Sequence, residues 1–221
     1  MSGIFTSSIG KKLLMSLAGI FLITFLLVHL GINLLVIIFD DPMVYNKAAH
    51  FMVSNILIKI VEILLFGGLL LHIIYALILQ IQNWIARPRR YSKTNYSNTS
   101  FFSKFMIHTA AIILVFLVIH FMDFYIKAKF GRAAELHVDG VLYHDFATEI
   151  VDKFKILPFV AFYIAAIIFL GFHLIHGFQS AFKTLGLDHK KYNPVIQLLA
   201  IIYTVVVVAG YSIIPLVIYF M

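Results

Sequence analysis

Five long apolar stretches determine what this chain of 221 residues can fold into. A bilayer core of about 30 Å is crossed by roughly 20 residues of α-helix, and unpaired backbone amides cannot face hydrocarbon. The alternating segments of about 10 residues that build a membrane barrel are absent from the sequence. The predicted spans cover residues 13–39, 56–85, 105–126, 156–182 and 194–220. The sequence therefore predicts an all-α integral membrane protein, in which residues 1–221 form one five-transmembrane-helix bundle.

The composition excludes most other classes of protein. Hydrophobic residues make up 62% of the chain and charged residues only 12%, whereas a soluble domain carries about 25% charged residues. Because there is no cysteine, the chain has no disulfide, thiolate metal site or iron–sulfur cluster of its own. The first span follows Lys11 and Lys12, but it is longer than the apolar core of about 7–15 residues in a signal peptide. We therefore expect a retained helix.

Basic residues concentrate in alternate connections. The N-terminal segment, the second connection and the fourth connection together hold ten basic residues and one acid, Asp188. The positive-inside rule then predicts a cytoplasmic N-terminus and a C-terminus outside. The second connection, residues 87–104, is either a solvated loop that sets the orientation or a docking surface for a cytoplasmic partner. On the other side, Asp139-Gly140 is typical of a turn, and residues 147–154 are predicted to form a short helix.

Four predicted spans each carry a histidine deep within them, namely His29, His72, His120 and His173. An ionisable side chain is costly in a membrane helix and is a functional candidate, although one buried histidine often serves only as an interhelical contact. Counting residues from the basic segments places His29 and His120 farther from the cytoplasm than His72 and His173. Zinc would need four ligands at one depth, whereas two haems with a histidine on each side use four in two layers. The pattern favours two b haems with these histidines as iron ligands. Without an open iron position, such haems suit electron transfer.

Other residues are candidates for contacts with the haems. Gly19, Gly67, Gly68 and Gly171 leave room for a macrocycle or serve plain helix packing. His176, one turn after His173, is a candidate propionate partner or alternative ligand. His108 is a candidate propionate partner or an interfacial histidine. His137, Asp139, His144 and Asp145 form no recognisable metal-binding spacing.

A quinone site needs apolar walls and a few polar groups near the head group. Glu62 is the one acid clearly inside a span, Asn33 lies one helical turn after His29, and His50 precedes the second span. These three are predicted to line a quinone site near the outer haem. The alternative for Glu62 is an interfacial acid that is exposed to water or paired with Lys59.

Five runs of sequence carry a resemblance to a known family. They are FLLVHLGIN (25–33), AAHFM (48–52), LLLHIIYAL (69–77), LVIHFMD (117–123) and GFHLIHG (171–177). Together they resemble the cytochrome b membrane anchor of succinate dehydrogenase and fumarate reductase, in its single-chain, five-helix, two-haem form. The resemblance implies that His29 and His120 hold the haem farther from the cytoplasm, and that His72 and His173 hold the nearer one.

The same resemblance implies a set of partners. The chain is expected in the bacterial cytoplasmic (inner) membrane, bound to a flavoprotein subunit and an iron–sulfur subunit of the respiratory chain and tricarboxylic acid cycle. It would exchange their electrons with a quinone, commonly menaquinone, and hold no dicarboxylate site itself. Some fumarate-reducing members carry a carboxylate where Gly171 stands, and some relatives carry acids where Val53 and Ser54 stand. These departures argue against a transmembrane proton path of that type, and because Gly171 replaces the carboxylate we expect succinate oxidation rather than fumarate reduction.

Two alternatives remain open at the level of sequence. The chain could be the cytochrome subunit of a hydrogenase or a formate dehydrogenase, which keeps the haems and changes the partner. It could also be a haem-free transporter whose histidines relay protons. Transporters of that kind often have helices broken in the middle, and here only Pro215 lies clearly inside a span.

Overall fold

The computed structural model describes residues 7–86, 105–130 and 134–221. Five helices in it are long and apolar enough to cross a membrane, which confirms the five predicted spans. Four of them are α1 (Ser8–Ile38), α3 (Ile56–Ile85), α8 (Leu157–Thr184) and α9 (Asn193–Phe220). The fifth runs from Met106 to Lys129 and consists of α5 (Met106–His120), the π-helical turn η1 (Phe121–Tyr125) and α6 (Ile126–Lys129).

Helices α1 and α3 begin where a side chain accepts hydrogen bonds from their free amides. The Ser7 hydroxyl accepts a hydrogen bond from the Gly10 amide at 3.0 Å, so α1 begins five residues before the predicted boundary. The Asn55 side chain accepts from the Leu57 amide at 2.9 Å and begins α3 where expected. Both α8 and α9 carry proline in their first turn, where a missing N–H costs no hydrogen bond.

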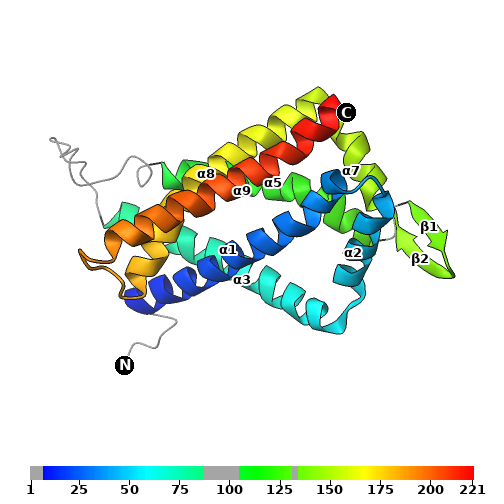
Figure 1. The fold of residues 1–221 in the computed structure, drawn as a ribbon. Coiled ribbons are helices and arrows are strands. Elements are labelled where there is room, and N and C mark those ends of the chain that lie inside the picture. Colours follow the sequence, from blue (N-terminus) through cyan, green and yellow to red (C-terminus); the bar gives the residue numbers. More distant parts are fainter. Residues whose placement is uncertain (1–6, 87–104, 131–133) are drawn as a thin grey trace.

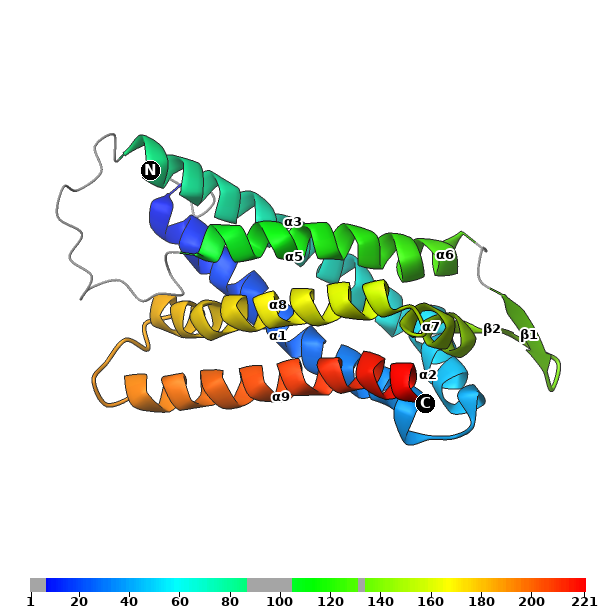
Figure 2. The same cartoon turned by 90° about the horizontal axis from the view of Figure 1, so that it is seen from above.

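The five helices alternate in direction (Figures 1 and 2). One end of the bundle gathers the starts of α1, α5 and α9 and the ends of α3 and α8; we call it the loop end, after the α8–α9 connection. Helix α8 packs along α9 and α5, and α1 contacts α3, α8 and α9. Helix α3 has no buried residue, and its Ile63 is 73% exposed. An apolar helix so exposed is suited to contact with lipid.

A small subdomain, which we call the cap, covers the opposite end of the bundle (Figure 1). It contains α2 (Pro42–Ser54), strands β1 (Glu135–Val138) and β2 (Val141–His144), and α7 (Phe146–Phe154). The strands pair antiparallel around Asp139 (φ 51°) and Gly140 (φ 77°), which are left-handed conformations typical of a two-residue hairpin turn. The predicted turn and short helix are therefore confirmed. Helix α2 and the hairpin strands were not predicted; they are a small addition to a bundle that agrees with the predicted all-α membrane fold.

The main hydrophobic core lies at the cap end. It joins the buried faces of α2 and α7 to α1, α8 and α9, and its members are Leu30, Tyr45, Phe146, Ala147, Ile150, Phe154, Val160, Tyr163, Ile214 and Ile218. Asn46, fully buried on α2, ties α7 to this core. Its side chain donates to the Asp145 carboxylate and accepts from the Ala147 amide, each at 3.0 Å. Because Asp145 also caps α7, a single polar cluster fixes both cap helices.

Candidate functional site: two histidine pairs

The first histidine pair lies nearer the cap and joins α1 to α5. The rings of His29 and His120 have centroids 5.8 Å apart at an interplanar angle of 85°. Phe25 stacks on His29 with a centroid distance of 5.2 Å, and Phe116 stacks on His120 at 5.5 Å. The ring of Tyr211 on α9 lies near His29, with a centroid distance of 6.0 Å. We call His29 and His120 the cap-side pair.

The second pair joins α3 to α8. The ring centroids of His72 and His173 are 6.3 Å apart at an interplanar angle of 70°. A Cβ atom added at Gly19 would lie 3.6 Å from the His72 ring, so Gly19 sits directly beside this pair on α1. Added Cβ atoms would lie 3.5 Å from Phe21 at Gly68 and in open space at Gly67. We call His72 and His173 the loop-side pair.

The two pairs occupy different depths in the bundle. His72 reaches the Met15 carbonyl on α1, and Met15 precedes His29 by 14 residues, or about 21 Å of helical rise. On α8, the residue beside His120 is Tyr163, ten residues before His173 and about 15 Å away along the helix. The rings thus meet in the two pairs that the sequence spacing predicted. A single four-histidine zinc site is incompatible with this separation.

The second ring nitrogen of three of these histidines has a polar neighbour. His72 Nδ1 lies 3.3 Å from the Met15 carbonyl oxygen, and His120 Nδ1 lies 3.3 Å from the Tyr163 hydroxyl. The Asn33 amide nitrogen donates to the His29 carbonyl oxygen at 2.7 Å and lies 3.3 Å from His29 Nδ1 and 3.4 Å from Nε2; as a donor it cannot accept a ring N–H. Within the described ranges, buried His173 Nδ1 has no hydrogen-bond partner. The neighbours of His72 and His120 are oxygens that can accept Nδ1–H, which leaves the lone pair of Nε2 free for a metal ion at these two rings.

The spacing of the rings fits one shared metal ion per pair. Two imidazoles that bind an ion from opposite sides at about 2 Å have ring centres about 6 Å apart, and the observed distances are 5.8 and 6.3 Å. Each pair could supply two nitrogen ligands, and the described residues contain no group of three or more side chains able to hold a metal ion. A metal whose other ligands come from a macrocycle, as in haem, matches this donor set. Aromatic neighbours provide apolar walls.

Two further histidines from the sequence prediction lie outside the pairs. His176 is half-buried on α8, one turn beyond His173 toward the loop end. His108 is exposed in the first turn of α5 beside the ring of Phe105, with a centroid distance of 5.9 Å. Their predicted propionate contacts stay predictions.

The three quinone candidates lie in different surroundings. Glu62 on α3 accepts hydrogen bonds from the Tyr125 hydroxyl and from Lys129 Nζ, the latter at 2.8 Å. Its ion pair is therefore with Lys129 rather than with Lys59. Asn33 is engaged with His29, and His50 packs edge-on against Tyr143 of the hairpin with a centroid distance of 4.9 Å. Across the described part of the chain, no hydrogen bond joins these three candidates.

Gly171 lies at a tight helix–helix contact. A Cβ atom added there would lie 2.7 Å from Val208 Cγ2 on α9, closer than real Cβ atoms approach. A carboxylate or any other side chain at this position would therefore clash with α9. Close packing of α8 against α9 is sufficient to account for glycine at this position.

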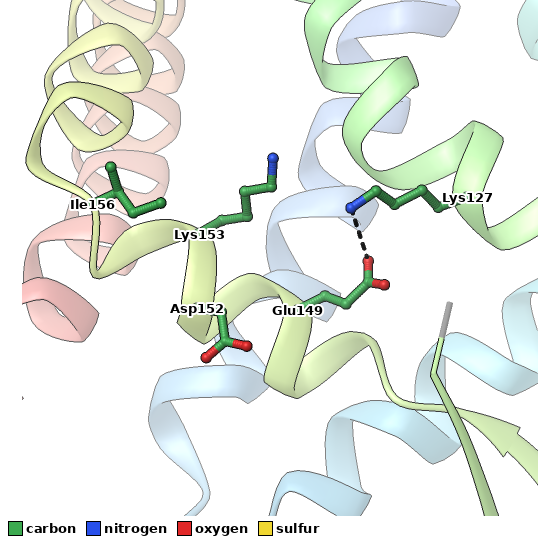
Figure 3. A pocket seen from close by; sticks show the side chains of 5 residues that line it. All are labelled: Lys127, Glu149, Asp152, Lys153 and Ile156. Carbon is green, nitrogen blue, oxygen red and sulfur yellow. Dashed lines mark ion pairs between the residues drawn. The ribbon is translucent and has the colours of Figure 1, made fainter. Parts of the chain in front are cut away.

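A polar pocket opens near the cap, between α6 and α7. Its lining residues are Lys127, Glu149, Asp152, Lys153 and Ile156. Lys127 pairs with Glu149 at 3.9 Å, and Figure 3 shows the Lys127 and Lys153 side chains pointing toward each other while Asp152 points away. Lys153 pairs with Asp123 at 2.6 Å, and Asp123 lies three residues after His120 in the chain. These pairs brace the end of the helix that carries His120.

Sequence reasoning missed Tyr163, Met15 and η1 as neighbours of the histidines. The η1 turn begins directly after His120, with the Ile126 amide bonded to the Phe121 carbonyl, and π-helical turns often occur at functional sites. No residue type in the run LVIHFMD signals a π-helical turn. Tyr163 can be read in the sequence ten residues before His173. Which residue its hydroxyl contacts depends on how α8 is rotated against α5.

Comparison with protein-family models, curated proteins and solved structures finds no match for this chain. The five apolar helices support a multi-pass membrane protein.

Proposed function

We propose that this chain is the di-haem cytochrome b anchor of a succinate:quinone oxidoreductase, in a bacterial cytoplasmic membrane. The observation that carries the proposal is the pair of two-histidine sites at two depths, with ring centroids 5.8 and 6.3 Å apart. Haem bound at such sites supplies one-electron transfer without an open iron position. The sequence motifs supply the choice of complex, since the same haem arrangement serves other quinone-linked enzymes.

The chain's own residues have distinct parts in this function. His72 and His173 would hold the inner haem, nearest a cytoplasmic iron–sulfur subunit with its flavoprotein, and His29 and His120 would hold the outer one. The Met15 carbonyl and the Tyr163 hydroxyl orient two of these rings. The phenylalanines stacked on the cap-side pair exclude water from it. The chain itself binds no dicarboxylate.

A quinone, most readily menaquinone, is proposed to bind near the cap-side pair. Glu62 supports this placement because it is a half-buried acid on α3, with a tyrosine hydroxyl and a lysine as partners. Such a group is able to exchange a proton with a quinone head group. The tight contact at Gly171 supports succinate oxidation over fumarate reduction, because no carboxylate fits at that position.

The haem assignment is tested by the reduced-minus-oxidised visible spectrum of the purified chain, with haem quantified per polypeptide. We expect about two low-spin b-type haems per chain. His29→Ala or His120→Ala should remove one, and His72→Ala or His173→Ala the other. His137→Ala, an exposed change in β1, is the matched control and should keep both.

Colourless protein from cells with adequate haem supply would contradict the cytochrome assignment and favour a transporter. The partner is tested separately, by adding succinate to membranes that contain the complex. Reduction of the haems by succinate, and co-purification of a flavoprotein and an iron–sulfur protein, are expected. Reduction by hydrogen or formate instead would favour the other enzyme class.

A further inference from the structure

Helix α8 carries two functional positions at two depths. His173 belongs to the loop-side pair, and Tyr163, ten residues earlier, meets the cap-side pair. The Tyr163 side chain is 5% exposed, and its hydroxyl oxygen lies 3.3 Å from His120 Nδ1. The inference below rests on the proposed function, because it concerns how His120 is presented to a haem.

The ring of Tyr163 is held by its neighbours. Its centroid lies 5.0 Å from Phe116, 5.2 Å from Phe154 and 4.6 Å from Phe159. These rings come from α5, α7 and α8, so three elements determine where the hydroxyl points. Because the phenol is packed on several sides, the position of its oxygen beside His120 is a consequence of the core.

The two pairs differ in what faces the second ring nitrogen. His72 Nδ1 faces the backbone carbonyl of Met15, which a side-chain substitution cannot remove. His120 Nδ1 faces a side-chain hydroxyl, which the change of one oxygen atom removes. A substitution of Tyr163 therefore changes the surroundings of His120 and leaves those of His72 unchanged.

We propose that Tyr163 is a positioning residue for the cap-side haem. Its hydroxyl accepts the Nδ1–H of His120, fixes the ring tautomer and turns Nε2 toward the centre of the pair. A histidine that donates from its second nitrogen is a more basic ligand and stabilises the oxidised iron. Tyr163 thereby lowers the reduction potential of the outer haem and leaves the inner haem unaffected.

The test compares Tyr163→Phe with Tyr203→Phe. Tyr203 of α9 is a matched control, because its hydroxyl donates to the Ile23 carbonyl at 2.8 Å and so bonds backbone rather than a haem ligand. Both chains are purified with haem, titrated by redox potentiometry and examined by electron paramagnetic resonance. The outer haem is identified as the one that His29→Ala removes.

In Tyr163→Phe we expect two haems, an outer potential shifted upward, a shifted low-spin signal from the outer haem and an unchanged inner haem. Tyr203→Phe should alter neither potential. An unchanged outer haem in a two-haem Tyr163→Phe chain, or an equal shift of both haems, would overturn this inference and leave the proposed function standing. A wild-type chain without haem would instead overturn both.

A second measurement covers a Tyr163→Phe chain that fails to fold. In wild-type protein, electron–nuclear double resonance of the oxidised outer haem reports the exchangeable proton on its histidine ligands. A hydrogen-bonded exchangeable proton at the outer haem, identified by its loss in deuterated water, supports the inference; it belongs to His120, because the Asn33 amide nitrogen beside the His29 ring cannot accept a proton. The absence of any such proton signal refutes it.

Discussion

At the scale of single residues, Gly171 shows how closely two helices are packed. A Cβ atom added there would lie 2.7 Å from Val208 and 3.5 Å from Thr204. Both neighbours belong to α9 and carry branched side chains with little rotamer freedom. The close contact between α8 and α9 therefore depends on residue 171 being glycine, which has no side chain.

Gly171→Ala is expected to destabilise the chain by about 1–3 kcal/mol, the usual cost of overpacking. Val208→Ala in the same chain should recover much of that loss, because it removes the clashing methyl group. Thermal unfolding in detergent measures both effects. Gly177→Ala is the control, since its Cβ would lie 3.8 Å from the end of the Met106 side chain. Equal losses at both glycines would show that the Val208 contact is not the cause.

Asp145 makes the cap sensitive to acid. Burial raises the pKa of this carboxyl, but hydrogen bonds from Asn46 and Thr148 outweigh burial and hold the pKa below its ordinary value of 3.8. A carboxyl whose pKa is lower in the folded state stabilises the fold at pH values above its unfolded pKa. That stabilisation declines as the pH falls below about 4 and is lost once the pH passes the folded pKa.

We expect wild-type protein to lose more thermal stability between pH 6 and pH 3 than Asp145→Asn does. Asparagine keeps a capping oxygen for α7 but has no proton to gain in this range. Melting temperatures at several pH values in one detergent give the comparison. Parallel curves for the two chains would mean that another acid governs the response.

At the scale of secondary-structure elements, η1 interrupts the helix that carries His120. A π-helical turn contains one residue more than the α-helical turn that it replaces. Removing one residue there restores regular α-helix and keeps the faces on either side in register. Removing one residue from regular helix rotates one side against the other by about 100°.

Deletion of Met122, inside η1, is therefore expected to retain both haems. Deletion of Val118, in α5, should lose the cap-side haem. The two residues are matched because both are exposed, at 60% and 51%. Haem per polypeptide and the visible spectrum report the result. Loss of the cap-side haem in both deletions would show that η1 itself is needed to place His120.

At the scale of the whole molecule, the two ends of the bundle differ in charge and in packing. The described part of the loop end carries Lys11, Lys12, Lys183, Lys190 and Lys191. The opposite end carries the cap and the main hydrophobic core. The positive-inside rule applied to this arrangement predicts a cytoplasmic loop end.

This orientation is testable because the chain has no native cysteine. Lys190→Cys places a single thiol in the α8–α9 connection, and His137→Cys places one in the exposed strand β1. In intact cells a membrane-impermeant maleimide is expected to label His137→Cys only. Lys190→Cys should react after permeabilisation. The reverse pattern would invert the proposed topology.

The sequence by itself determined the five spans, the two depths of the histidines, the Asp139-Gly140 turn and the helix at α7. These features depend on hydrophobic length, residue spacing and local turn chemistry, which are properties of contiguous residues. Helix α2 was missed although Asp41 and Pro42 give it an ordinary start, because it is short and only partly apolar.

Only the tertiary structure decided which side chains meet across helices. It paired Glu62 with Lys129 rather than with the nearby Lys59, set Tyr163 against His120, and closed Gly171 against Val208. Each of these contacts depends on the rotation and relative height of two helices. Nearly uniform apolar faces do not encode that rotation, so it follows from how the side chains of the whole bundle pack together.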